Sequence, residues 1–310
     1  MSIPISYSRS PLELIRARSS VRRFTGELVS GEVRSELQRC CRQVRLGPFG
    51  GACRFRLIDN PAGGDRSERV GAYGLIRGAR TYLGGATGAS RYNLEDFGYL
   101  FELLLLKATD LGMGSCWLGG TFTRSRFARA MELQGEEIIP AVSPIGVPTR
   151  QRSMVDQVIR WGAGSKRRKP WEQLFYDNES AAPLSEDRAG PFAAALEMVR
   201  LAPSASNRQP WRCLKAGQTI HFYLQRFPGY RSLLQTDLQR IDMGIALSHF
   251  DLAVAASGIQ GSWQVLDPPA LQSSPLSLPE AWQRCEYLVS WDTAARGTAA
   301  RGTAARNPEP

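Results

Sequence analysis

A repeat within the chain constrains the fold more than any other feature of the sequence. The run Val-Arg-Leu-Gly-Pro at 44–48 returns as Val-Arg-Leu-Ala-Pro at 199–203, which is 155 residues further along. The copies then diverge, because Phe-Gly-Gly-Ala follows the first and Ser-Ala-Ser-Asn follows the second. Self-similarity at a fixed distance indicates a duplicated scaffold. We therefore expect two copies of one unit, of which only the second has kept a polar loop.

A second set of matches extends the repeat into the middle of each copy. Identical residues recur 146 positions later for Gly98, Leu106, Gly112 and Trp117. Several of them fall in the stretches 97–111 and 241–256, which are apolar nearly all round and so predict buried helices. We expect these helices to pack against each other across a pseudo-twofold axis, as identical subunits do. The chain would then be an intramolecular pseudo-dimer.

Helix-like and strand-like segments alternate in both copies, which predicts an α+β fold. We assign 1–175 to the first half and 176–292 to the second. Residues 293–310 repeat Thr-Ala-Ala-Arg-Gly without core-forming side chains, so we expect a disordered tail there. The β-like stretch 138–147 contains Pro144, which indicates an edge strand or a bulge.

Composition and charge exclude several classes of protein. No apolar run approaches the ~20 residues that cross a bilayer, and the N-terminus has no secretory apolar segment. The six cysteines form no Cys-x-x-Cys pair and the two histidines lie far apart, so we expect no metal site and a cytoplasmic location. The net charge of +10 is compatible with nucleic-acid binding, but the cationic residues lack the aromatic pattern of a binding module. We expect neither a membrane nor a nucleic acid as a partner.

Two basic segments have the residue types that hold a phosphate group. One is Arg-Ser-Ser-Val-Arg-Arg-Phe at 18–24, and the other is Lys-Arg-Arg-Lys-Pro at 166–170. Guanidinium groups form forked, charge-assisted hydrogen bonds with phosphate, and a serine hydroxyl adds a neutral donor. A charged helix face or a basic linker would explain the same residues without a ligand.

Four segments, taken together, resemble the motifs of the FMN-dependent nitroreductases. The segment 18–24 resembles their Arg-x-Ser-x-Arg-x-Phe motif, and Pro-Ser-Ala-Ser-Asn-Arg-Gln-Pro-Trp at 203–211 resembles their Pro-Ser-x-x-Asn-x-Gln-Pro-Trp segment. Leu-Gly-Gly-Thr-Phe at 118–122 is similar to their glycine loop, and 166–170 to their Lys-x-Arg-x-Pro element. The whole arrangement, from about residue 12 to residue 291, is similar to the fused two-copy TM1586-like nitroreductase branch, which implies a nitroreductase-like fold.

The resemblance implies one flavin site that both copies build. The FMN phosphate would be held by the basic segments, through Arg18, Ser19, Ser20, Arg22, Lys166 and Arg168. The flavin ring would be contacted by Gly119, Gly120, Pro203, Ser204, Ala205 and Asn207, with the two glycines near its N5 atom. No catalytic side chain is expected, because the flavin N5 atom carries the chemistry.

The asymmetry between the copies predicts one FMN per chain. Residues 173–177 (Gln-Leu-Phe-Tyr-Asp) stand where the second copy would need its phosphate-binding arm, and they cannot hold a phosphate. The loop 49–52 of the first copy lacks the Ser and Asn of its counterpart. One site is complete and the other is broken, so we expect a monomer that acts as a pseudo-dimer.

The implied function is that of an FMN-dependent nitroreductase or flavin oxidoreductase. NAD(P)H would be a transient electron donor, and hydride transfer would be ping-pong, to a nitroaromatic, a quinone or a similar small acceptor. The chain has no Gly-x-Gly-x-x-Gly fingerprint, so NAD(P)H would visit the flavin pocket. Three alternatives stay open: a flavoprotein of the same fold with different chemistry, a non-catalytic flavin-binding protein, and a basic nucleic-acid-associated protein.

Overall fold

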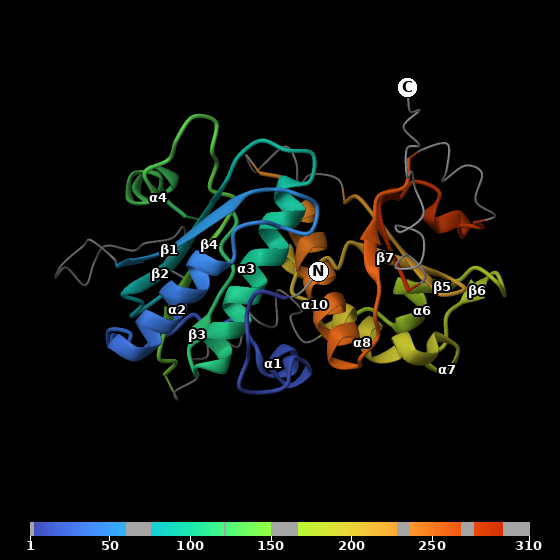
Figure 1. The fold of residues 1–310 in the computed structure, drawn as a ribbon, viewed down its shortest axis with the longest axis horizontal. Helices are drawn as coiled ribbons and strands as arrows, with labels where there is room; N and C mark the ends of the chain where they lie inside the picture. The colour runs from blue at the N-terminus through green and yellow to red at the C-terminus, as the bar shows by residue number, and fades with distance from the viewer. Residues whose placement is uncertain are drawn as a thin grey trace, which may run out of the picture.

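The computed structural model describes residues 3–59, 76–120, 122–149, 167–227, 236–267 and 276–293. Two β-sheets lie toward opposite ends of the molecule, with the long helices α3 (Asn93–Asp110) and α10 (Leu238–Ala256) between them (Figure 1). The order of elements confirms the predicted α+β class. Lys166 and all but the first residue of the tail 293–310 lie outside the described ranges.

The first sheet is antiparallel and has four strands in the order β1-β2-β4-β3. Its strands are β1 (Cys53–Asp59), β2 (Thr81–Thr87), β3 (Gly114–Ser115) and β4 (Val142–Gly146). The edge position or bulge expected for the strand with Pro144 is wrong, because β4 lies between β2 and β3 and pairs with β2 in unbroken register. The proline is tolerated there because β3 pairs only with Ile145 and Gly146, beyond the proline. Helices α2 (Gly31–Gln43) and α4 (Arg124–Met131) flank this sheet (Figure 1).

The second sheet has six strands in the order β6-β5-β7-β8-β10-β9. They are β5 (Phe175–Asp177), β6 (Ala182–Pro183), β7 (Trp211–Ala216), β8 (Thr219–Leu224), β9 (Ser262–Gln264) and β10 (Glu286–Asp292). Only the β5–β7 pair is parallel among them. The accompanying helices are α6 (Trp171–Leu174), α7 (Glu186–Ala189), α8 (Ala193–Leu201) and the 3-10 turns η2 (Gly190–Phe192), η3 (Ala205–Asn207) and η4 (Glu280–Trp282).

The helices α3 and α10 cross in close contact at a pair of glycines. A Cβ atom on Gly98 would collide with the carbonyl oxygen of Ile241, and one on Gly244 would collide with that of Glu95. Gly98 and Gly244 are 146 residues apart, and so are Glu95 and Ile241. The two contacts are therefore reciprocal, which is the pattern that a twofold axis produces. Most residues of both helices are buried, as their apolar sequences predicted.

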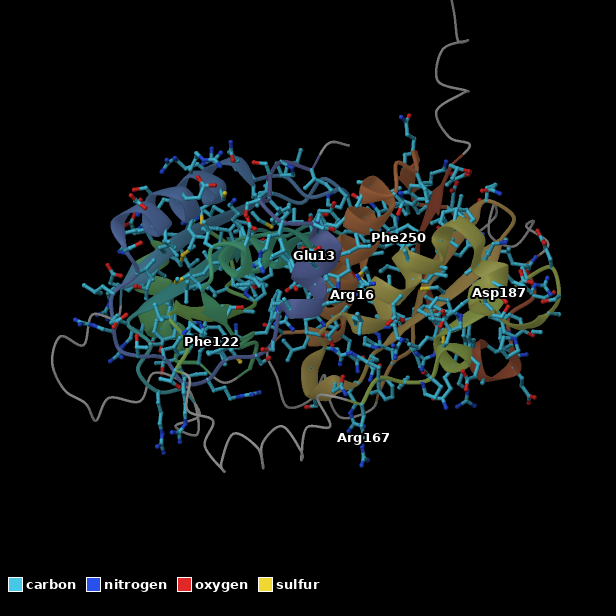
Figure 2. All side chains as sticks on the ribbon, turned by 90° about the horizontal axis from the view of Figure 1, so that it is seen from below. Glu13, Arg16, Phe122, Arg167, Asp187 and Phe250 are labelled. Carbon is cyan, nitrogen blue, oxygen red and sulfur yellow. The ribbon has the colours of Figure 1, made fainter. Side chains whose placement is uncertain are left out.

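One hydrophobic core runs through both halves of the chain. It joins side chains of α2, α3 and β1 to side chains of α8, α10, β7 and β8. The helix α1 (Pro11–Ala17) packs against α3, α8 and α10, so the N-terminal segment bridges the halves. Figure 2 shows Glu13 and Arg16 of α1 near the middle of the molecule, between the two halves. Each half therefore buries apolar surface against the other half.

Candidate functional site

A cleft of about 260 Å³ is lined by residues from both halves of the chain. Ten of the twelve predicted site residues line it: Arg18, Ser19, Ser20, Arg22, Gly119, Arg168, Pro203, Ser204, Ala205 and Asn207. Gly120 is not among the lining residues, and Lys166 lies outside the described part of the chain. The remaining lining residues were not predicted: Cys116, Trp117, Ala141, Ser206, Leu238, Ile241, Asp242 and Ile245.

The segment that carries Arg18 is fixed beside the first sheet. It follows α1 directly, because Arg18 is the residue that caps the C-terminal end of that helix. Ser20 then forms a parallel bridge with Ser115 of β3, and the Val21 N–H donates to the Ser115 carbonyl oxygen at 2.8 Å. These backbone bonds hold the segment at the cleft wall.

The Arg18 side chain is buried, and two of its three nitrogen atoms lack a hydrogen-bond partner among the described residues. It is 6% exposed, and its Nε atom lies 3.3 Å from Glu102 Oε1. Within the described residues, neither Nε nor Nη1 makes a hydrogen bond. A buried donor without a partner costs about 1–3 kcal/mol, and more when the group is charged. Because Arg18 also lines the cleft, its Nη1 atom is suited to an anionic ligand there.

A second guanidinium approaches the cleft from the segment that precedes α6. Arg168 donates to Asn207 Oδ1 and to the Leu201 carbonyl oxygen, both at 2.7 Å. Burial and, to a smaller extent, the charge of Arg18 lower the pKa of Arg168 to about 10. The neighbouring Arg167 is exposed and extends away from the molecule in Figure 2. Arg18, Arg22 and Arg168 thus give the cleft a concentration of positive charge.

The loop opposite these arginines has an unusual backbone. Ser206, Asn207 and Gln209 have φ values of +48°, +54° and +51°, in the left-handed region that non-glycine residues rarely adopt. Three hydrogen bonds hold this conformation: Gln209 N–H to Ser204 Oγ at 2.8 Å, Asn207 Nδ2 to the Arg167 carbonyl at 2.8 Å, and Ala205 N–H to Asp242. Backbone strain of this kind persists where the surrounding structure enforces it, often at ligand sites.

Asp242 is a buried acid of the cleft that the sequence reasoning missed. Its oxygens accept the Ala205 N–H at 3.0 and 3.1 Å, so α10 anchors the loop. Burial raises its pKa well above the ordinary value. Asp96, which precedes it by 146 residues, accepts the N–H groups of Phe49 and Gly51 at 2.9 and 2.6 Å. Both aspartates could have been identified from the sequence, because Asp96 and Asp242 stand at matching positions of two apolar helices.

In the first copy, aromatic rings pack around Phe49, which stands where the second copy has Ser204. The ring of Phe49 lies 5.2 Å from that of Tyr92 and 6.0 Å from that of Trp263. Trp263 is the repeat partner of Trp117, which lines the cleft. Residues 173–177 belong to α6 and β5 of the second sheet and do not line the cleft. The region around Phe49 thus has rings where the cleft has the small residues Pro203, Ser204 and Ala205.

The described ranges hold no group of three or more His, Cys, Asp or Glu side chains that could bind a metal ion. Across those same ranges, no helix has the length and apolar character to span a membrane.

Comparison with known proteins identifies relatives of this fold. The family model described as "Putative TM nitroreductase" matches residues 11–254. A "putative nitroreductase" of Thermotoga maritima MSB8 is 18% identical, with a TM-score of 0.54, and the match covers 94% of this chain and 99% of that chain. A "putative nitroreductase in complex with FMN" from Desulfovibrio desulfuricans is 23% identical over 48% of this chain and 95% of that chain, with a TM-score of 0.36. No curated protein sequence matches the chain.

Proposed function

The chain belongs to the TM nitroreductase family and has its α+β nitroreductase-like fold, and from this premise we propose that it is an FMN-dependent oxidoreductase. The family supports a flavin oxidoreductase in general terms. The finer proposal, that FMN occupies the cleft described above, depends on the residues that line it. It includes the predicted roles of the twelve site residues.

The Nη1 atom of Arg18, which is buried without a hydrogen bond, is the observation that carries the proposal. Its Nη1 atom is buried at a cleft wall without a hydrogen-bond partner among the described residues, and Arg22 and Arg168 line the same cleft. The phosphate of FMN carries about two negative charges near neutral pH and offers three acceptor oxygens. Such a group would satisfy the Arg18 donor and offset the repulsion between the arginines.

The opposite side of the cleft suits the flavin ring. Pro203, Ser204 and Ala205 offer small side chains and backbone groups that a planar ring can approach. A methyl group on Gly119 would press on Leu238, which lines the cleft as well, so the glycine keeps that wall open. Gly120 and Lys166 are proposed on the resemblance of their motifs alone.

We propose one FMN per chain and a monomer that acts as a pseudo-dimer. The reciprocal contacts of Gly98 and Gly244 support a twofold relation between the halves. At Phe49, Tyr92 and Trp263 rings pack together, and the Arg91 guanidinium lies 5.2 Å over the Tyr92 ring. The chain would thus have kept one site of the two that a symmetric dimer has.

Bound FMN would supply the redox chemistry, which we propose to be ping-pong hydride transfer from NAD(P)H to a nitroaromatic, a quinone or a similar small acceptor. The protein would hold the phosphate with Arg18, Arg22 and Arg168. It would orient the ring with the loop that Asp242 anchors.

The test is the absorption spectrum of the purified protein, with the released cofactor quantified after denaturation. About one FMN per chain that NADH or NADPH bleaches supports the proposal, whereas two per chain contradict the single site. Bound FMN that neither donor reduces favours a non-catalytic flavin-binding protein. A colourless protein that does not take up added FMN refutes the proposal.

A matched pair of arginine variants tests the phosphate assignment. Arg18→Ala should weaken FMN binding roughly 10- to 100-fold, because a charge-assisted hydrogen bond of about 1.5–3 kcal/mol is lost. Arg34→Ala is the control, since Arg34 lies on α2, outside the cleft lining, and pairs with Asp59. Equal losses of FMN affinity in the two variants would contradict the assignment.

A further inference from the structure

A buried carboxylate lies behind the Arg18 guanidinium. Glu102 of α3 is fully buried, and its Oε1 atom lies 3.3 Å from Arg18 Nε. The same oxygen lies 3.1 Å from Nε2 of His249, a fully buried residue of α10. Trp117 donates its indole N–H to the other oxygen, Oε2, at 2.7 Å. Each half of the chain therefore supplies one member of the Glu102–His249 pair.

The contacts of His249 determine where its protons lie. Its Nδ1 atom lies 3.0 Å from the Met198 carbonyl oxygen, and a carbonyl oxygen only accepts, so Nδ1 carries a proton. Nε2 and Glu102 Oε1 are 3.1 Å apart, and two bare acceptors at that distance would repel each other. One proton therefore lies between them. The Glu102–His249 pair has no net charge, whichever of the two atoms holds this proton.

We propose that Glu102 and His249 are positioning residues that hold Arg18 in place without neutralising it. A carboxylate alone at this position would form an ion pair with Arg18 and cancel its charge. The neutral pair fixes the Nε side of the guanidinium and leaves the positive charge for an anion in the cleft. That this anion is the phosphate of FMN rests on the proposed function, whereas the arrangement of protons does not.

Among the residues that the structure describes, the other charged and titratable groups around the Glu102–His249 pair add no negative charge beside Arg18. Arg22 and Arg168 line the cleft and are cations. Burial raises the pKa of the Tyr7 hydroxyl and of the Cys116 thiol, so both are neutral. Burial also raises the pKa of the Asp242 carboxyl well above its usual value, which favours its neutral form. The charge of Arg18 therefore remains available to a ligand.

The test is a double-mutant cycle on FMN affinity, measured near neutral pH by titration of flavin fluorescence. His249→Asn keeps a donor for the Met198 carbonyl but is too short to reach Glu102. The carboxylate is then bare and neutralises Arg18, so we expect FMN affinity to fall roughly 10- to 100-fold. Glu102→Gln leaves a neutral amide that donates to His249 Nε2, although its NH2 group then also faces the Arg18 Nε–H. Since no carboxylate neutralises Arg18, FMN affinity should fall far less than in His249→Asn.

The double variant distinguishes an effect on the charge beside Arg18 from a purely structural role of the two residues. With both changes Arg18 again has no carboxylate beside it, so the double variant should bind FMN far better than His249→Asn alone. His221→Asn is the matched control, because His221 is also buried but bonds to Ser290 in the second sheet. If Glu102→Gln loses as much affinity as His249→Asn and the double variant loses more, the inference is wrong.

A second measurement needs no flavin. The ¹⁵N NMR signals of histidine in the unliganded protein should show a protonated Nδ1 on His249, in the wild type and in Glu102→Gln. A bare Nδ1 would overturn the proton arrangement. A wild-type protein with the expected Nδ1 signal that does not bind FMN would refute the proposed function and leave the proton arrangement standing.

Discussion

The contact between α3 and α10 predicts a strong effect of adding one methyl group. In Gly98→Ala the new Cβ atom would overlap the carbonyl oxygen of Ile241 and lie 3.1 and 3.2 Å from that residue's carbonyl carbon and Cα. These are backbone atoms within a buried helix, so no side-chain rotation can relieve the overlap. The helices must move apart, and their shared core must repack.

The expected magnitude follows from two opposing terms. Overpacking of a well-packed core costs about 1–3 kcal/mol, and more when backbone has to shift. Replacing glycine by alanine inside a helix stabilises the helix by about 1 kcal/mol, because alanine has the higher helix propensity. Because the overlap here is with backbone on a helix that cannot yield locally, we expect a net loss of about 2 kcal/mol in the free energy of unfolding. Gly244→Ala, the reciprocal change against Glu95, should cost a similar amount.

Urea denaturation followed by circular dichroism would measure this effect. Gly31→Ala is the matched control, because Gly31 starts α2 and a Cβ atom there would have no neighbour within 4 Å. The control should be neutral or slightly stabilising. If Gly98→Ala shifted the midpoint in the same direction as Gly31→Ala, the close crossing of α3 and α10 would be refuted.

Two further predictions concern the loop and the rings of the first copy. Burial raises the pKa of Asp96 to about 6 in the folded protein, above the usual range of the unfolded chain. The protonated carboxyl therefore contributes to the free energy of unfolding below about pH 4, and this contribution is lost as pH rises through about 6. The loss amounts to about 3 kcal/mol in the free energy of unfolding. Urea denaturation of Asp96→Asn at pH 4 and pH 7 should show that the variant has lost most of this pH dependence. An unchanged pH dependence would contradict the assignment. Phe49→Ala should lower the free energy of unfolding by about 2–3 kcal/mol, because it opens a cavity beside Tyr92 and Trp263. It should leave the FMN content near one per chain, and a second bound FMN would show that the rings alone block the other site.

Several features of the candidate site could be read from the sequence because they are local. The segments 18–24 and 203–207 contain their arginines, serines and asparagine within a few residues of each other, and the structure brings both segments to one cleft. The repeat at a fixed offset located the two buried helices without any knowledge of their contacts. Short-range patterns of this kind survive in the sequence because each is fixed by the local backbone and its burial.

Other features depended on contacts between residues far apart in the chain. Glu102 and His249 meet across 147 positions, and neither belongs to a motif with its partner. The predicted edge position of β4 failed because a strand's neighbours are set by distant segments, here the two residues of β3. Asp242 was missed because an acid inside an apolar helix has no local pattern that shows which backbone N–H it accepts.

The sequence by itself determined the fold class, the position of the two buried helices and the segments that supply the arginines. It could do so because the periodicity of apolar residues, the length of apolar runs and the short polar motifs are all patterns of residues that lie close together in the chain. Only the tertiary structure decided that α3 and α10 cross at reciprocal glycines, that Phe49 packs against Tyr92, and that Arg18 stands beside Glu102. These outcomes depend on packing and on the burial of charge, which are properties of atoms brought together by folding rather than of neighbours in the chain.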